Sequence, residues 1–213
     1  MEDLFNMLFR FGHILVGITW IGLLYYFNFI QTEYFKEAEE SARKDAVAKL
    51  APRALWWFRW AAFLTFLTGL ALLHYISVKI TLEIILGATM GTLMMLNVWG
   101  IIWPNQKIVI GLKEGDVAVA GPKAGLASRT NTLFSVGMLY FMVASAHYPA
   151  SGQVLGANLE MTGTGFLVGL AIIFAIQANA IWGKMLPAIA SVRSVIISSF
   201  ALCVGLSSVV YYL

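Results

Sequence analysis

Three histidines are the side chains of this sequence best suited to hold a metal, and each lies on a different apolar segment. His13 lies near the start of the first segment, His74 near the end of the second and His147 at the end of the fourth. A neutral imidazole is a common axial ligand of haem iron and also binds copper and zinc. The three rings therefore predict a redox or metal site if the fold places them at one depth.

Small residues accompany two of these histidines at helical spacing. His13, Gly17 and Trp20 share one face of a helix, so Gly17 leaves a groove one turn from the imidazole. Gly69 lies in a similar way below His74. A groove beside a ligand would accept a flat macrocycle. The alternative is that the glycines let membrane helices pack closely.

Composition places the chain among integral membrane proteins. Apolar residues make up 60% and charged residues 12% of the 213 residues, whereas soluble domains are about half apolar and a quarter charged. A helix needs about 20 apolar residues to cross the hydrocarbon layer. We therefore predict a single all-α domain over residues 1–213, a polytopic bundle of about six transmembrane helices. The expected spans are 8–30, 57–78, 82–103, 133–148, 165–182 and 195–213.

The placement of lysine and arginine predicts the orientation of this bundle. Of the 14 such residues, only Arg10 and Lys79 lie outside the loops 31–56, 104–130 and 184–193 and their flanks. Basic loops stay in the cytoplasm, so both termini are predicted to be periplasmic, in the inner membrane of a bacterium. The same loops explain the net charge without nucleic acid as a partner. The turn formers of 104–130 predict a mostly irregular segment.

This orientation brings the three histidines toward the periplasmic face and gathers a second polar group at the cytoplasmic end. Helix capping and aromatic anchoring explain many residues of that group. Asn97 and Asn179 lie deeper and need partners, for which each would serve the other. A substrate or quinone pocket is the alternative explanation. Its candidate residues are Asn97, Trp99, Lys107, Arg129, Asn131 and Asn179.

Several strings of the sequence resemble one known family. They are HILVGITWIGLLYYFNFIQ, LMMLNVWGIIWPNQK, ASRTNTLFSVGMLYFMVASAH and ANAIWGK. They are similar to the membrane domain of the bacterial membrane-bound, cytochrome-linked urate oxidases, also called urate hydroxylases. The likeness covers nearly the whole chain, and NVWGIIWPNQK and SRTNT are its specific motifs. The HxxxGxxWxG segment also resembles, more weakly, other membrane proteins that hold b-type haem, including the bacterial membrane protoporphyrinogen oxidases.

The resemblance implies a helical membrane module that passes electrons to a c-type cytochrome on its outer side. The residues at the family's motif positions are His13, Trp20, Asn97, Trp99, Arg129, Asn131 and His147. The sequence departs from the family pattern in two ways. Full-length members carry a C-terminal cytochrome c domain, but these 213 residues contain no CxxCH motif. Gly137 stands where the pattern has proline.

Three functions are compatible with the sequence. The first is a b-type haem protein that relays electrons near the periplasmic face, alone or in a larger redox complex, with His13, His74 and His147 as ligands. The second is an oxidase of urate or another small heterocycle that reduces a separate cytochrome c. Arg10 would then hold an anionic substrate, or would only anchor its helix. The third is a copper or zinc site on the same histidines. A purely structural accessory subunit is the alternative to all three.

Overall fold

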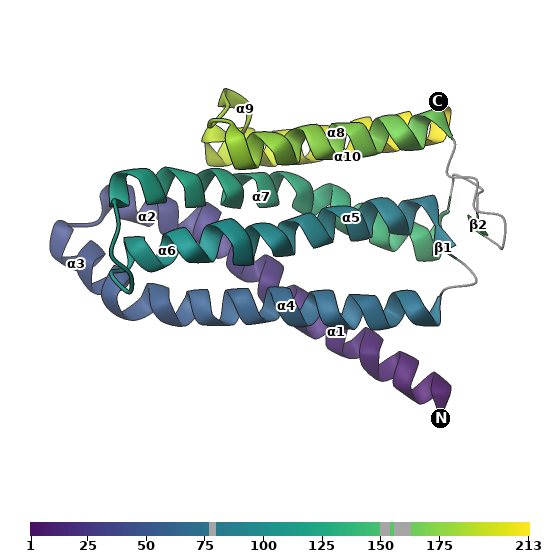
Figure 1. Cartoon of the computed structure of the whole chain (residues 1–213), viewed down its shortest axis with the longest axis horizontal. Coiled ribbons are helices and arrows are strands. Elements are labelled where there is room, and N and C mark those ends of the chain that lie inside the picture. Colours follow the sequence, from purple (N-terminus) through teal and green to yellow (C-terminus); the bar gives the residue numbers. More distant parts are fainter. Residues whose placement is uncertain (77–79, 150–153, 156–162) are drawn as a thin grey trace.

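The protein is an all-helical bundle whose long helices run side by side (Figure 1). The computed structural model describes residues 1–76, 80–149, 154–155 and 163–213. Two-residue strands, β1 and β2, pair in antiparallel fashion, and the η segments are π-helical. The elements in chain order are α1 (Glu2–Tyr25), η1 (Tyr26–Gln31), α2 (Thr32–Glu37), α3 (Glu40–Asp45), η2 (Ala46–Leu50), α4 (Ala51–Tyr75), β1 (Ile80–Thr81), α5 (Leu82–Asn97), η4 (Val98–Ile102), α6 (Trp103–Val109), α7 (Val117–His147), β2 (Val154–Leu155), α8 (Thr164–Trp182), α9 (Pro187–Ala190) and α10 (Val192–Tyr212).

Neighbouring helical segments join into longer rods through π-helical turns. η2 ends shortly before Pro52 and η4 shortly before Pro104. Proline has no N–H to donate to the carbonyl four residues earlier, and a wider turn ahead of it still pairs the neighbouring N–H groups. The rods are Glu2–Glu37, Glu40–Tyr75 and Leu82–Val109.

Five helical rods among the described residues are long and apolar enough to cross a membrane. They are the three above together with α8 and α10. The other expected span, 133–148, lies almost wholly in α7, which has 31 residues but a more polar sequence. The expected span 57–78 ends at residues 77–78, outside the described part of the chain. The all-α prediction is confirmed, the chain is a multi-pass membrane protein, and both termini lie at one end of the bundle (Figure 1).

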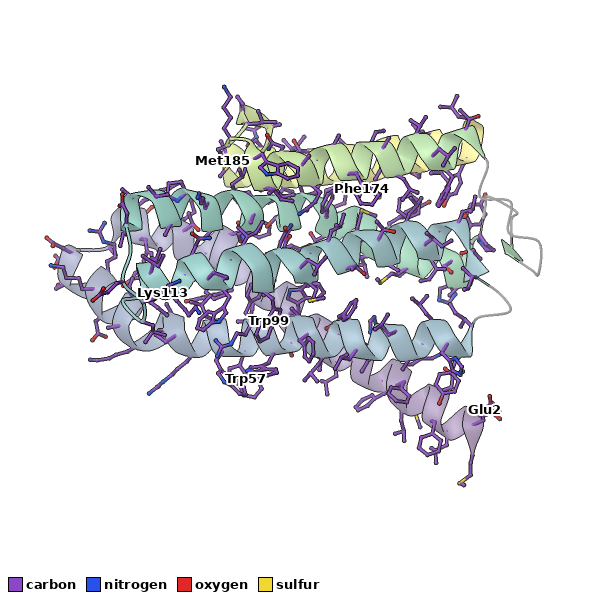
Figure 2. The ribbon with its side chains drawn as sticks, in the orientation of Figure 1. Glu2, Trp57, Trp99, Lys113, Phe174 and Met185 are labelled. Atoms are coloured by element: carbon purple, nitrogen blue, oxygen red, sulfur yellow. The ribbon has the colours of Figure 1, made fainter. Side chains whose placement is uncertain are left out.

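Apolar side chains cover the outside of the bundle, whereas polar ones collect inside. Ile18 and Val204 are 67% and 64% exposed, and Trp57 projects from α4 away from the other helices (Figure 2). Lipid accepts such a surface, and polar groups in spans normally face the interior of a bundle. The buried polar side chains include Asn28, Asn97, Arg129, Asn131 and Gln177.

α7 forms the centre of the bundle. It packs against α5, α6 and α10 and also contacts α1 and α8. Phe134 and Phe141 are fully buried and join the main apolar core, which includes Phe58. Gly87 allows α5 to approach α7 closely, because a Cβ there would lie 3.1 Å from the backbone nitrogen of Met142. The central position of α7 explains why its sequence can be more polar than that of the lipid-facing helices.

The segment 104–130 is mostly helical, so the prediction of an irregular loop is wrong. α6 continues to Val109 and α7 begins at Val117, which leaves 110–116 between them. Asp116 caps α7, because its carboxylate accepts a hydrogen bond of 2.8 Å from the backbone N–H of Ala118. The helix then continues through Pro122.

Candidate functional site

His13 is held by the neighbouring helix α4. Its Nδ1 lies 3.0 Å from Oγ1 of Thr68. The Thr68 hydroxyl donates its proton to the backbone carbonyls of Leu64 and Thr65, at 2.7 and 3.0 Å. A hydroxyl has one proton, so where Thr68 donates to a backbone carbonyl, His13 Nδ1 is the donor to Thr68. The neutral ring then carries its lone pair on Nε2, which is the form that ligates a metal.

The other two histidines lie apart from this contact. His74 is exposed near the end of α4, where its ring meets that of Tyr75 with 6.0 Å between centroids. His147 is exposed at the end of α7. Within residues 1–76, 80–149, 154–155 and 163–213, no three His, Cys, Asp or Glu side chains form a group that could hold a metal ion. The structure thus brings His13 against α4 but does not assemble a three-histidine cluster among these residues.

The residues expected to form a groove instead pack α1 against α4. A Cβ on Gly69 would lie 3.2 Å from Cε1 of His13, so the His13 ring fills the space at this glycine. A Cβ on Gly17 would lie 3.9 Å from Cγ2 of Thr65. Trp20 is 2% exposed, and its Nε1 has no hydrogen-bond partner among the described residues. This geometry is close helix packing of the kind small residues permit.

Asn97 belongs to a buried amide network near the middle of the rod Leu82–Val109. Asn97 Nδ2 donates to Asn131 Oδ1 at 2.8 Å and to Gln177 Oε1 at 2.9 Å. Asn131 Nδ2 donates in turn to the carbonyl of Met94 at 2.9 Å. The expected pairing of Asn97 with Asn179 is therefore wrong, because Asn179 Nδ2 donates to the backbone carbonyl of Lys184 at 3.2 Å.

Trp99 helps to join α4 to the α5–α6 rod, whereas Lys107 contacts Trp103 within α6. Trp99 Nε1 donates to the carbonyl of Arg59 at 3.1 Å. The Arg59 guanidinium lies 3.9 Å from the centroid of the Trp103 ring, and Lys107 Nζ lies 5.6 Å from it. These are cation–π contacts.

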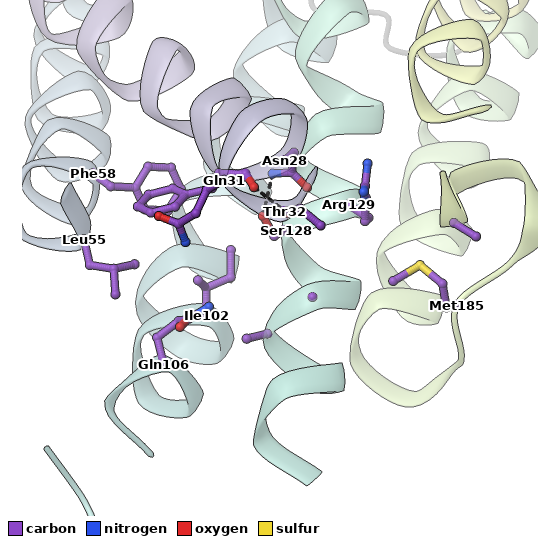
Figure 3. Close-up of a pocket in the computed structure, with 14 residues that line it drawn as sticks. Asn28, Gln31, Thr32, Leu55, Phe58, Ile102, Gln106, Ser128, Arg129 and Met185 are labelled. Atoms are coloured by element: carbon purple, nitrogen blue, oxygen red, sulfur yellow. Dashed lines mark hydrogen bonds between the residues drawn. The ribbon is translucent and has the colours of Figure 1, made fainter. Parts of the chain in front are cut away.

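A pocket of about 280 Å³ lies beside this network (Figure 3). It forms where η1 and the start of α2 meet α4, the end of η4, α6 and α7, with the chain after α8 at its edge. Its lining combines amides, hydroxyls, one guanidinium and apolar side chains. The lining residues are Phe27, Asn28, Gln31, Thr32, Leu55, Phe58, Ile102, Gln106, Ala124, Gly125, Ser128, Arg129, Met185 and Ala190.

Two polar atoms of this lining are buried without partners. Arg129 is 6% exposed, and its Nη1 has no hydrogen-bond partner in the described part of the chain. Oε1 of Gln31 is buried and unpartnered in the same sense. By contrast, Asn28 Nδ2 donates to the carbonyl of Leu24 at 2.9 Å and to Oγ of Ser128 at 2.8 Å. Among the described residues, the lining therefore holds one cationic donor and one acceptor without partners, a pair suited to a polar ligand.

Most residues of this pocket escape the sequence prediction, which names only Arg129 among them. Asn28, Gln31 and Thr32 lie at the spacing that puts three residues on one helical face. That polar face at the end of the first apolar segment is the signal that could have found them. Hydropathy alone places this face at the end of a span and the start of a loop, because it does not indicate that the helix continues to Glu37.

The fold and this pocket define a multi-pass helical membrane protein with a buried polar site at one end. Residues 78–176, just under half of the chain, match the family described as Urate oxidase N-terminal. This stretch is therefore urate-oxidase-like, and it includes Asn97, Arg129 and Asn131. Comparisons with curated proteins and with solved structures gave no match.

Proposed function

We propose that the chain is the membrane part of a urate-oxidase-like oxidoreductase. The reaction would be a two-electron oxidation of urate or a similar small heterocycle, whose electrons reduce two molecules of a ferric c-type cytochrome. The observation that carries this proposal is the match of residues 78–176 to the urate oxidase N-terminal family. The resemblance in the NVWGIIWPNQK and SRTNT strings supports the membrane-bound, cytochrome-linked type.

The contact between those two strings adds to this support. The first string begins at Asn97 and the second contains Asn131, and the two side chains are hydrogen-bonded at 2.8 Å. Two stretches separated in the sequence therefore form one buried unit between α5 and α7. Arg129, from the second string, borders the pocket beside that unit. Motifs that this chain shares with the family and that build one pocket wall are consistent with an activity shared with the family.

The proposed location is the inner membrane of a bacterium. Basic loops would keep the pocket end in the cytoplasm and both termini in the periplasm, where a c-type cytochrome would accept electrons. Both termini lie at one end of the bundle, so they share a side as this orientation requires (Figure 1). The lipid bilayer is the other partner, in contact with the exposed apolar surface.

A urate-dependent electron transfer assay tests the proposed function. Membranes from cells that express the chain, and membranes from cells with an empty vector, receive urate and ferric cytochrome c. We expect urate-dependent reduction of the cytochrome, seen in its visible absorbance, only where the chain is present. Equal rates in the two membranes would contradict an oxidase activity. Urate consumption without cytochrome reduction would reject the cytochrome as acceptor.

A b-type haem relay is the second candidate function, favoured by the geometry of His13. Thr68 fixes the imidazole through Nδ1, which leaves Nε2 as a ligand atom. His74 on α4 is the candidate second ligand, and haem iron would supply one-electron redox chemistry. Purified protein should then show a haem absorbance that His13→Ala abolishes and that His147→Ala preserves. Copper or zinc in metal analysis, without haem absorbance, would favour the metal-ion alternative.

A further inference from the structure

The pocket bordered by Arg129 carries an inference about where the substrate binds. We propose that it binds the oxidisable heterocycle in its anionic form, with Arg129 as the anchor. The ligand enters from the end of the bundle that carries the basic loops. This inference rests on the proposed function for the identity of the ligand, whereas the geometry of the pocket does not depend on that function.

Arg129 places a buried positive charge in the lining of the pocket. A guanidinium remains charged in proteins, and a buried charge without a partner is costly. Glu33 attracts it electrostatically, but Glu33 is ion-paired with Lys36 at 2.8 Å. Among the described residues Arg129 forms no salt bridge, and its Nη1 is free. A planar oxyanion is the ligand that a guanidinium pairs with best.

The rest of the lining also favours a ligand with a hydrogen-bond donor and a flat ring. Gln31 Oε1 has no partner among the described residues and can accept a hydrogen bond from an N–H or O–H group of the ligand. Phe58, with Leu55 and Ile102, forms an apolar wall that suits a flat ring. In Figure 3, Phe58 and Arg129 lie on opposite sides of Asn28, so the pocket has an aromatic side and a charged side. A heterocyclic anion that retains N–H groups offers all three features.

The position of the pocket gives the side of entry. It lies at the end of the bundle opposite to both termini, where α2, α3 and α9 are found (Figure 1). Arg10, the anchor considered from sequence for a site at the outer face, lies near the N-terminus. Its Nε donates to Asn6 Oδ1 at 3.0 Å, and it is exposed. The buried Arg129 guanidinium, whose Nη1 has no partner among the described residues, is therefore at the end of the predicted cytoplasmic loops.

Binding of radiolabelled urate to the full chain tests this site directly. The chain is purified in nanodiscs of neutral phosphatidylcholine, and the dissociation constant is measured by equilibrium dialysis. We expect Arg129→Gln to raise this constant roughly 10- to 100-fold, because a charge-assisted hydrogen bond is lost. The dissociation constant of Arg129→Lys should lie between those of the wild type and Arg129→Gln, since lysine keeps the charge but not the planar donor pair. Arg10→Gln is the matched control and should bind as the wild type does.

A second pair of variants covers the case in which Arg129→Gln fails to fold. Gly125 lines the pocket, and nothing lies within 4 Å of a Cβ placed on it. A Cβ fits there without displacing a neighbour, and the larger side chain of Gly125→Leu should occupy the pocket and abolish urate binding. Gly121→Leu, one turn earlier on α7 and equally open, is the control. Folding of each variant is checked by its thermal melting curve.

The outcomes separate this inference from the proposed function. If membranes oxidise urate with an unchanged KM in Arg129→Gln and Gly125→Leu, the pocket is not the site although the proposed function stands. If urate binds in an Arg129-dependent way but cytochrome c is not reduced, the site stands and the function fails. Absence of urate binding overturns the site, and native mass spectrometry would then show whether Arg129 retains an anionic phospholipid.

Discussion

Asn97 and Gln177 exchange two hydrogen bonds across the bundle. Asn97 Nδ2 donates to Gln177 Oε1 at 2.9 Å, and Gln177 Nε2 donates back to Asn97 Oδ1 at 2.7 Å. Because Asn97 also donates to Asn131, one amide ties α5 to both α7 and α8. Buried amides cannot replace a lost partner with water, so breaking these hydrogen bonds is costly. The network therefore fixes the rotation of the three helices about their own axes.

Gln177→Leu tests the contribution of that exchange to stability. The change leaves Asn97 Oδ1 buried without the donor that Gln177 supplies. We expect the free energy of unfolding to fall by about 1–2 kcal/mol, measured by unfolding in mixed micelles of increasing denaturing detergent. Ser208→Ala, at an exposed position of α10, is the control and should have little effect. Equal losses in the two variants would show that the pair does not stabilise the fold.

The same network shows how far the sequence alone leads. Hydropathy predicts the helices and the burial of Asn97, since apolar runs and deep polar residues are local properties. The predicted partner of Asn97 is wrong. Asn179 and Gln177 lie two residues apart on α8 and therefore point in different directions. Which one faces Asn97 depends on the rotation of α8, and packing sets that rotation. A single sequence does not contain this information in any local pattern.

The pocket shows a second limit. Arg129 can be found from its type and position, but Gln31 and Asn28 become site residues only because α1 continues through η1 into α2. Hydropathy ends the span near residue 30, since charged residues follow. When a helix extends beyond the hydrocarbon layer, the same side of it still points into the bundle. Polar residues on that side can line a cavity. The length of such an extension follows from tertiary packing rather than from apolar composition.

Gly87→Ala should destabilise the bundle although alanine is the better helix former. A Cβ at this position would lie 3.0 Å from Met142 Cγ and 3.2 Å from the backbone oxygen of Met138. Backbone atoms cannot move aside as a flexible side chain can, so α5 and α7 must separate. We expect a loss of about 1–3 kcal/mol in the free energy of unfolding.

Gly100→Ala is the matched control for Gly87→Ala. It lies on the same rod, and nothing lies within 4 Å of its Cβ position. It should be neutral or stabilising by up to about 1 kcal/mol. A neutral Gly87→Ala would mean that α5 and α7 do not approach as closely as the structure has them.

Arg59→Gln tests the contact between α4 and the α5–α6 rod. The guanidinium lies 3.9 Å from the Trp103 ring centroid, and its loss removes a cation–π contact. We expect the free energy of unfolding to fall by about 0.5–1 kcal/mol. Arg53→Gln, on the same helix at an exposed position, should be neutral in the same unfolding measurement. An equal loss in both variants would point to membrane anchoring by positive charge instead.

Thr68→Val tests the proton position inferred for His13. His13 Nδ1 lies 3.0 Å from Thr68 Oγ1, and if Nδ1 is the donor, nitrogen NMR of histidine-labelled protein should show one neutral ring with its proton on Nδ1. Valine keeps the shape of threonine but cannot accept this bond, and the signal should move toward the other tautomer. Because the chain has 3 histidines, His13→Gln assigns the signal. An unchanged spectrum in Thr68→Val would show that Thr68 does not orient the ring, and His13 would then lose its main structural argument as a ligand.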